Sequence, residues 1–221
     1  MKLQLDELVE NPNIKSDLQT ALHLAAEKGH AEIVNILLNH GAQVEATNKW
    51  TQSPLQLAAE TGHLAAGKEL LDKGANVHPQ DIAEMTVLHW AAIKGRAQFV
   101  QLLLEWKANQ EVRDNTQRTA FDCAIKNKHK EAARALRGRI NVKDQNGQTA
   151  LHRAAIAADL DTVQLLMDLD ADMLTIDNAG ETPLEVMAKN GLEEAVQGLE
   201  KVAEFLQNIS DVAEGVYNFF S

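Results

Sequence analysis

The sequence predicts an all-α solenoid of about six stacked helix-turn-helix units with a cap at each end. A seven-residue block, Thr-Ala-Leu-His-Leu-Ala-Ala in its first copy, recurs along the chain at a nearly constant period. After each block and a tight turn comes a second apolar run at helical spacing. Apolar residues make up 45% of the chain but aromatic residues only 4%. The core must therefore consist mainly of Ala, Leu, Ile and Val, which suits closely packed helices.

The block predicts the first helix of each unit. Its copies begin at residues 20, 53, 86, 119, 149 and 182, so they lie 33 residues apart except for one step of 30. The first three copies match closely, and the last three are looser. In Thr119–Ile125, for example, Phe121 and Cys123 stand where the first copy has leucine. Copies spaced this regularly indicate that one supersecondary unit repeats along the chain.

A second amphipathic run, such as Glu32–Leu38, predicts the second helix of each unit. Gly41-Ala42 and Gly74-Ala75 close it, because glycine readily adopts the left-handed conformation that ends a helix. Lys107 and Asp170 stand where the earlier units have this glycine. We expect these two positions to be mildly strained or to form another kind of turn.

Block, period and second run together resemble the ankyrin repeat over roughly residues 14–200. The resemblance implies antiparallel helix pairs that stack on their neighbours, with turns projecting sideways and polar caps at the ends. It also implies that the block histidines His23, His89 and His152 bond to the neighbouring turn. The expected units are a half-repeat cap at 1–14, repeats at 15–47, 48–80, 81–113, 114–143 (short), 144–176 and 177–208 (with an extended second helix), and a capping helix at 209–221.

The two ends and the fourth unit depart from the regular pattern. Leu5, Leu8 and Val9 could form the apolar face of an N-terminal half unit. The apolar positions of the last second helix continue through Leu206, and Ser210 or Asn208 could then cap a short helix. That C-terminal helix would be a cap, a docking element for a partner, or the start of a further domain. The three missing residues of the fourth unit are either a tolerated loop deletion or a bend.

We expect no enzyme activity, no cofactor and no metal. The histidines of the blocks and tight turns recur at the repeat period, which favours a structural role. None of the eight lies at the spacing of a helical zinc site. Cys123, the only cysteine, occupies a slot held by leucine in other copies and is expected to be a small, half-buried side chain. A single cysteine also fits a reducing compartment.

In the ankyrin family the first helices line a concave groove, and partners bind there and at the turn tips. Trp50, Ile82, Met85 and Ile93 are apolar at slots that are normally exposed, and Trp90 adds an indole at a half-exposed slot. Clustered aromatic and aliphatic side chains are typical of interface hot spots. The alternative is that they pack on one another. The residues predicted to bind a partner are Trp50, Gln52, Ile82, Met85, Trp90, Ile93, Lys94, Arg118 and Lys126. Trp106 is expected to pack on a neighbouring turn.

Charge is unevenly distributed along a chain whose net charge is −11. Residues 126–143 hold seven basic side chains and one acid, and residues 159–221 hold fourteen acids and two bases. The basic run is a solvated helix face, or it attracts an acidic partner or the acidic C-terminal third of the chain. An acidic array without a basic stripe interleaved with aromatic residues disfavours nucleic acid.

The sequence therefore predicts a non-catalytic protein-interaction module, a scaffold, adaptor or regulatory subunit, that is a monomer in isolation. Met85–Ala91 with Thr119–Asp122 is also similar to the ankyrin domain of the beta subunit of GA-binding protein, which holds a DNA-binding subunit with its turn tips. The alternatives are the targeting arm of a larger enzyme, a secreted bacterial host-directed effector, or a structural spacer. No stretch is long and apolar enough to span a membrane. We expect an intracellular, cytoplasmic protein, with the nucleus or secretion into a host cell as alternatives.

Overall fold

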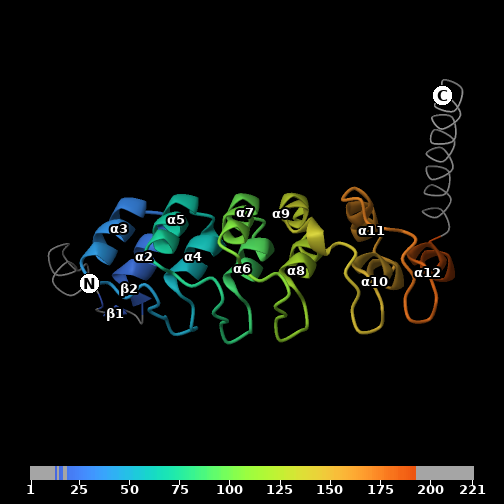
Figure 1. The fold of residues 1–221 in the computed structure, drawn as a ribbon, viewed down its shortest axis with the longest axis horizontal. Helices are drawn as coiled ribbons and strands as arrows, with labels where there is room; N and C mark the ends of the chain where they lie inside the picture. Colours follow the sequence, from blue (N-terminus) through green and yellow to red (C-terminus); the bar gives the residue numbers. More distant parts are fainter. Residues whose placement is uncertain (1–12, 14, 17–18, 193–221) are drawn as a thin grey trace, which may run out of the picture. The chain divides into compact units, whose positions relative to one another are not determined.

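The structure is a computed structural model that describes residues 13, 15–16 and 19–192, in which antiparallel helix pairs follow one another (Figure 1). The first helices are α2 (Ala21–Lys28), α4 (Pro54–Thr61), α6 (Val87–Ile93), α8 (Ala120–Lys126), α10 (Ala150–Ile156) and α12 (Pro183–Lys189). The second helices are α3 (Ala31–Asn39), α5 (Leu64–Asp72), α7 (Ala97–Glu105), α9 (Lys130–Ala135) and α11 (Leu160–Met167). The predicted all-helical repeat fold is confirmed. The expectations for the N-terminal cap through residue 12 and for the helices beyond residue 192 lie outside the described residues.

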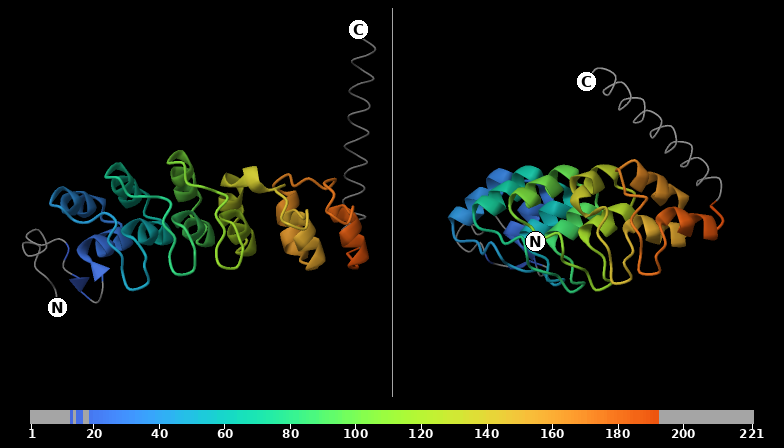
Figure 2. Two further views of the ribbon diagram at one scale, coloured as in Figure 1. Left: turned by 60° about the horizontal axis from the view of Figure 1, so that its bottom comes forward. Right: turned by 45° about the vertical axis from the view of Figure 1, so that its right-hand side comes forward.

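The chain divides into two compact units, Met1–Arg139 and Ile140–Ser221. In the first unit α2, α4, α6 and α8 stack in one layer, and α3, α5, α7 and α9 stack in a second layer above them (Figure 2). In the second unit α10 packs against α11 and α12. The boundary falls directly after the short α9 and the 3-10 turn η1 (Arg137–Arg139), where the sequence lacks three residues. Before α2, strands β1 (Lys15–Ser16) and β2 (Gln19–Thr20) form a small antiparallel pair, with Lys15 opposite Thr20.

Every first helix begins at the Ser or Thr of the repeated block. The hydroxyl oxygen of this N-cap residue accepts from the backbone N–H three residues later at Thr20, Ser53, Thr119, Thr149 and Thr182. The side chain of that later residue bonds back to the N-cap, which completes a capping box. Histidine, glutamine, aspartate and glutamate all fill this position, so an imidazole, an amide and a carboxylate are interchangeable in it.

The block histidines also tie each repeat to the next one. Nε2 of His23 lies 3.1 Å from the carbonyl oxygen of Gln52, Nε2 of His89 lies 3.1 Å from that of Arg118, and Nε2 of His152 lies 3.0 Å from that of Glu181. Because a carbonyl only accepts, Nε2 carries the proton. The bond to the neighbouring turn that the family resemblance implies is therefore present. Burial lowers the pKa of His89 below its ordinary value of 6.5, which keeps this imidazole neutral at physiological pH.

Two of the histidines that follow the tight turns pack over a glycine of the preceding repeat. A Cβ atom at Gly29 would lie 2.4 Å from Nδ1 of His63, and one at Gly95 would lie 2.7 Å from Nδ1 of His129. Both glycines also have left-handed backbone angles, with φ of 75° and 66°. Packing between repeats thus explains why histidine occupies these two positions.

One Asn or Asp side chain organises each of the extended turns that precede the first helices α4, α6, α8, α10 and α12. We call these turns the finger loops. The Oδ1 of this side chain accepts from the backbone N–H groups two and four residues later in all five loops, which begin at Asn48, Asp81, Asp114, Asp144 and Asp177. Three residues after each of these the backbone is left-handed, at Thr51, Glu84, Gln117, Gly147 and Gly180. The loops without glycine therefore keep the conformation of the loops that have it.

Lys107 and Asp170 are left-handed, with φ of 60° and 64°, so the expectation of mild strain holds.

We predict that Lys107→Gly raises the free energy of unfolding by about 0.5–1 kcal/mol, because glycine avoids the strain of a left-handed residue at a smaller entropic cost. The equivalent glycines, Gly41 and Gly74, have no atom within 4 Å of a built Cβ, so no packing is lost. Urea denaturation measures the change. Lys68→Gly, inside α5, is the control and should lower stability by about 1 kcal/mol; equal effects of the two substitutions would contradict the assignment of strain.

Candidate protein-binding surface

The candidate site is a surface of the first unit that we call the finger face. It consists of the finger loops 48–52, 81–85 and 114–118 together with the solvent-facing side chains of α4, α6 and α8. Within it, Trp50 is 47% exposed and Ile82 is 73% exposed. Met85, Trp90, Ile93 and Arg118 are partly exposed, whereas Lys94 and Lys126 are exposed. Eight of the nine predicted residues therefore reach solvent on neighbouring repeats.

Gln52 is the exception, and its assignment to an exposed binding surface is wrong. Its side chain is only 9% exposed and accepts from Nδ2 of Asn48 at 3.1 Å. The same loop position holds the partly exposed Met85 and Arg118 in the next two repeats. Gln52 differs because the amide of Asn48 has a donor to offer, which the carboxylates Asp81 and Asp114 lack.

Trp90 is held in place by a buried carboxylate. Its Nε1 donates to Oδ2 of Asp81 at 2.7 Å, and Asp81 is only 8% exposed. Oδ1 of the same carboxylate organises the finger loop at 81–85. One side chain thus fixes both the loop that carries Ile82 and Met85 and the orientation of the indole ring. A positioned aromatic ring loses little entropy when a partner binds.

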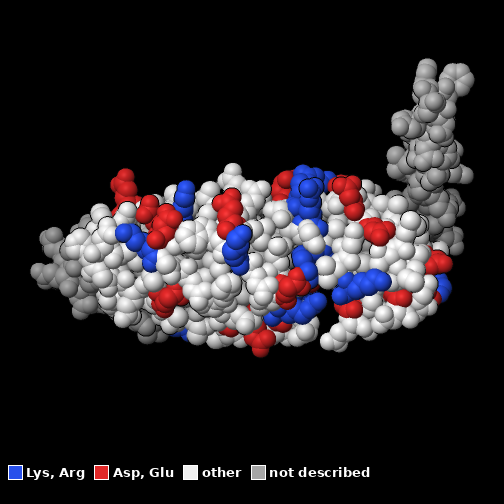
Figure 3. Space-filling view, in the orientation of Figure 1, with Lys and Arg blue, Asp and Glu red and all other residues white. Residues whose placement is uncertain are grey.

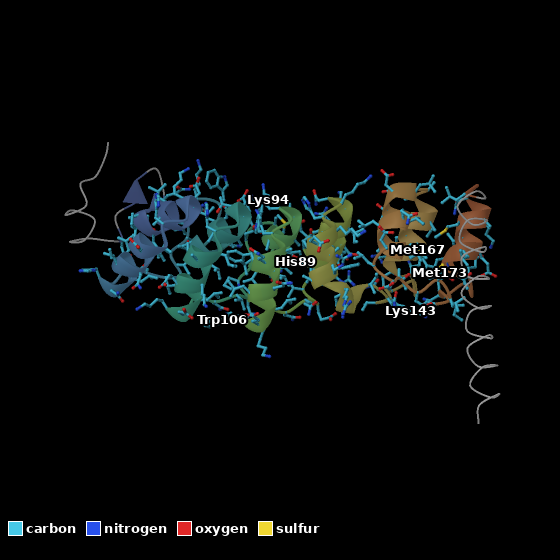
Figure 4. All side chains as sticks on the ribbon, turned by 90° about the horizontal axis from the view of Figure 1, so that it is seen from above. His89, Lys94, Trp106, Lys143, Met167 and Met173 are labelled. Atoms are coloured by element: carbon cyan, nitrogen blue, oxygen red, sulfur yellow. The ribbon has the colours of Figure 1, made fainter. Side chains whose placement is uncertain are left out.

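A lysine borders this ring at the end of α6. Nζ of Lys94 lies 5.9 Å from the centre of the Trp90 ring and 3.0 Å from the carboxylate of Glu60 on α4. Lys94, at the end of α6, and Trp106, at the end of α7, lie at opposite edges of this repeat when it is seen from above (Figure 4). Trp106 is 39% exposed. Its surface is therefore separate from the finger face.

Trp50 sits at the tip of the first of the three finger loops. Nζ of Lys49 lies 4.1 Å from the ring centre, and the backbone N–H of Trp50 donates to Oδ1 of Asn48 at 2.9 Å. Oγ1 of Thr51 accepts from the backbone N–H of Ile82 at 3.1 Å, so this tip is tied to the next loop. The exposures of Trp50 and Ile82 show that these two side chains do not bury one another. The alternative of mutual packing does not account for them.

Arg118 is bound to Asp114 in the third finger loop. Its Nε and Nη2 donate to Oδ2 of Asp114 at 3.0 and 2.7 Å, and the Asp114 side chain is only 1% exposed. Although burial alone raises the pKa of Asp114, the hydrogen bonds from Arg118 and Thr116 outweigh it and lower that pKa to about 2. Asp81 and Asp114 are the positioning residues that the site prediction left out. The signal was available, because an Asn or Asp opens every finger loop at the repeat period.

Cys123 is fully buried, whereas the sequence predicted a half-buried side chain. Its side chain is 1% exposed, and burial raises the pKa of its thiol to about 11. A thiol with this pKa is almost entirely protonated at pH 7 and is a poor nucleophile. Among the described residues, no group of three or more His, Cys, Asp or Glu side chains is placed to hold a metal ion.

The basic run at 126–143 begins at the end of α8 and continues through α9 and η1. Lysine and arginine side chains gather over α8 and α9 in Figure 3. Part of its charge is already engaged within the first unit, because Arg134 pairs with Glu131 at 2.9 Å and Arg139 pairs with Glu111. In the second unit Nζ of Lys143 donates to the carbonyl oxygen of Ile176 at 2.6 Å. Lys126 remains exposed on the finger face. The run is therefore a mixture of structural bases and accessible ones.

Comparison with known proteins agrees with this architecture. The family model described as ankyrin repeats (3 copies) matches residues 2–81, 68–144 and 137–208. Among solved structures, the ankyrin repeat domain of Bcl-3, a member of the IkappaB protein family, has a TM-score of 0.69 and 28% sequence identity, covering 81% of this chain and 86% of that one.

A curated relative is similar over a much shorter stretch. L-asparaginase of Dirofilaria immitis is 40% identical over 63 residues, which is 28% of this chain and 11% of that protein. The chain thus spans about a tenth of the length of this relative. No described helix is both long enough and apolar enough to cross a membrane. The family model covers most of the chain, and the chain belongs to the ankyrin-repeat family.

Proposed function

We propose that this chain is a non-catalytic protein-interaction module that binds a protein partner on the finger face of repeats 2–4. The observation that carries the proposal is the exposure of Trp50 and Ile82 on adjacent finger loops, next to an indole, Trp90, that Asp81 holds in place. Large apolar side chains on a rigid support are the usual centre of a protein interface.

The rigidity of the surface supports the same function. The three finger loops are linked through Thr51 to Ile82 and through the carbonyl oxygen of Ala83 to the N–H of Asn115, at 3.1 and 3.2 Å. Each loop is also closed internally by its Asn or Asp. A surface that is already ordered binds with a smaller entropic cost than a flexible one.

We expect Trp50→Ala combined with Met85→Ala to reduce recovery of the partner at least tenfold in affinity capture from the native cell, because hot-spot truncations commonly cost 2 kcal/mol or more, roughly 30-fold in affinity. The captured proteins are identified and quantified by mass spectrometry. Circular dichroism of the variant establishes that it is folded.

Trp106→Ala is the matched control. It removes the same residue type at a similar exposure, 39% against 47% for Trp50, from the end of a second helix. It should leave recovery unchanged. Equal recovery by the folded double variant and the wild-type protein would exclude the finger face as the binding site.

A further inference from the structure

Two large apolar side chains of the second unit are exposed close together in the chain. Leu174 is 76% exposed and Ile176 is 52% exposed. Both belong to the segment 172–176, which leads from the end of α11 towards the finger loop before α12. Exposure alternates along this segment, because positions 172, 174 and 176 are exposed whereas 173 and 175 are only partly exposed. Leu174 and Ile176 therefore lie on its outward side.

The equivalent positions of the earlier repeats are polar. Leu174 lies three residues before the Asp that opens its finger loop, and Ile176 lies one residue before it. In repeats 1 to 4 these two positions hold Glu45 and Thr47, His78 and Gln80, Glu111 and Arg113, and Asn141 and Lys143. The apolar pair is thus a departure from the repeat pattern at the last connection that the structure describes.

Contacts in the first unit show which way the position of Leu174 faces. The carboxylate of Glu45 accepts from the backbone N–H of Asn76 at 2.9 Å, and Glu111 pairs with Arg139. Each partner lies in the corresponding segment of the following repeat, 31 and 28 residues later. The side chain at this position is therefore directed towards the next repeat.

The second unit repeats this arrangement at both positions. Oδ1 of Asn141 accepts from the backbone N–H of Asp172 at 2.9 Å, 31 residues later. Nζ of Lys143 donates to the carbonyl oxygen of Ile176 at 2.6 Å, 33 residues later. Leu174 and Ile176 occupy the same two positions one repeat further on, so we expect their partner to lie 28 to 33 residues later as well.

That spacing leads to residues 202–209, which lie outside the described residues. Their sequence is Val-Ala-Glu-Phe-Leu-Gln-Asn-Ile, with five apolar side chains and one charge. The earlier repeats place polar groups opposite polar groups at this contact. Here an apolar pair meets an apolar stretch of the same chain, and removing both from water stabilises their association.

The first helix of the last repeat also leaves an apolar face open. Leu151 and Ala155 of α10 are both 0% exposed. The equivalent residues of α12 are Leu184, which is partly exposed, and Ala188, which is exposed. In a repeat array each unit buries its apolar face against the next one, and the last unit needs a cap. This open face indicates that chain beyond residue 192 belongs against the last repeat.

We propose that residues 202–209 of this chain bind over Leu174 and Ile176, with Phe205, Leu206 and Ile209 as the large apolar side chains that cover them. An apolar contact then replaces the hydrogen bonds and ion pairs that join the earlier repeats at these positions. Of the roles open to the C-terminal residues, this contact assigns 202–209 to a cap of the array.

The test compares the reactivity of two cysteines towards a maleimide in the folded, full-length chain. Leu174→Cys and Ile82→Cys replace side chains of similar exposure, 76% and 73%, and the native Cys123 is only 1% exposed. We expect the cysteine at position 174 to react at least about tenfold more slowly than the one at position 82, because a covered thiol reacts only when the contact opens locally. Equal rates would overturn the proposal.

A variant of the capping segment provides the control. Phe205→Ser combined with Ile209→Ser should bring the rate at position 174 to within about twofold of the rate at position 82, because the apolar contact is lost. The rate at position 82 should not change, and circular dichroism establishes that the variant is folded. Slow labelling at position 174 that persists in this folded variant would contradict the assignment to residues 202–209.

A second copy of the chain is the other candidate occupant of this apolar pair. Contacts between copies weaken on dilution, whereas a contact within one chain does not. We expect the slow labelling at position 174 to be unchanged by a dilution of about a hundredfold. Labelling that becomes as fast as at position 82 on dilution would overturn the proposal in favour of a contact between copies.

Discussion

Combining Gly67→Val with Phe99→Ala should restore most of the stability that each substitution removes alone. Phe99 on α7 is 1% exposed, and Gly67 on α5 of the preceding repeat is buried. A Cβ atom at Gly67 would lie 2.4 Å from Cζ of Phe99, so the phenyl ring fills the space that the glycine leaves. Phe99→Ala alone should cost about 3–5 kcal/mol, because it opens a cavity in a packed interface.

The neighbouring interfaces show why the exchange should work. The positions equivalent to Gly67 and Phe99 are Val34 with Ala66 one repeat earlier and Val100 with Ala132 one repeat later. In each of these pairs the side chain on the earlier second helix is large and the one on the next second helix is small. In the pair of Gly67 and Phe99 the sizes are reversed. Urea denaturation of the wild type, both single variants and the double variant measures the coupling. A double variant as unstable as the sum of the singles would contradict this account.

Gly67→Ala provides a further check on the same interface. In an ordinary helix interior, replacing glycine with alanine stabilises by about 1 kcal/mol. Here it should destabilise by about 1–3 kcal/mol, because the added methyl group overlaps the phenyl ring. The sign of the change therefore separates close packing from helix propensity.

Asp114→Ala should lower the free energy of unfolding by about 3–5 kcal/mol at neutral pH. The substitution removes a buried carboxylate that accepts from Thr116 and from both the backbone and the side chain of Arg118. Chemical denaturation at pH 7 measures the loss. The finger loop at 114–118 would also lose its fixed conformation, so binding at repeat 4 should weaken.

The ionisation of Asp114 also makes the free energy of unfolding depend on pH. Its pKa is about 2 in the folded protein against an ordinary 3.8. The ionised carboxylate therefore stabilises the fold above about pH 4, and this contribution of about 2 kcal/mol is lost as the pH falls towards 2.

Asp114→Asn is the matched variant for this titration, because Asn48 organises the equivalent loop two repeats earlier. Its stability should depend less on pH between 4 and 2 than that of the wild type. Identical pH profiles of the two proteins from urea denaturation would contradict a role for this carboxylate.

Local features of the fold could be predicted because they repeat. The block, with its Ser or Thr and a polar residue three positions later, fixes where each first helix begins. The left-handed positions at Lys107 and Asp170 followed from comparison with Gly41 and Gly74. In the finger loops, the Asn or Asp at the first position holds Glu84 and Gln117 in the conformation that glycine adopts in later repeats.

Other features depend on contacts between units, which a single repeat does not reveal. The exchange of size between Gly67 and Phe99 becomes meaningful only when it is known which second helices stack. Gln52 was misassigned because its burial depends on the Asn48 amide. Asp81 was passed over because its second oxygen reaches Trp90, nine residues away in the sequence.

The most direct test of the finger face is site-specific photo-crosslinking in the native cell. A benzophenone amino acid replaces Ile82, which is 73% exposed on the second finger loop, or Ile36, which is 44% exposed on α3. Binding at the finger face predicts a crosslinked partner from position 82 and none from position 36. A partner crosslinked from position 36 but not from position 82 would contradict it.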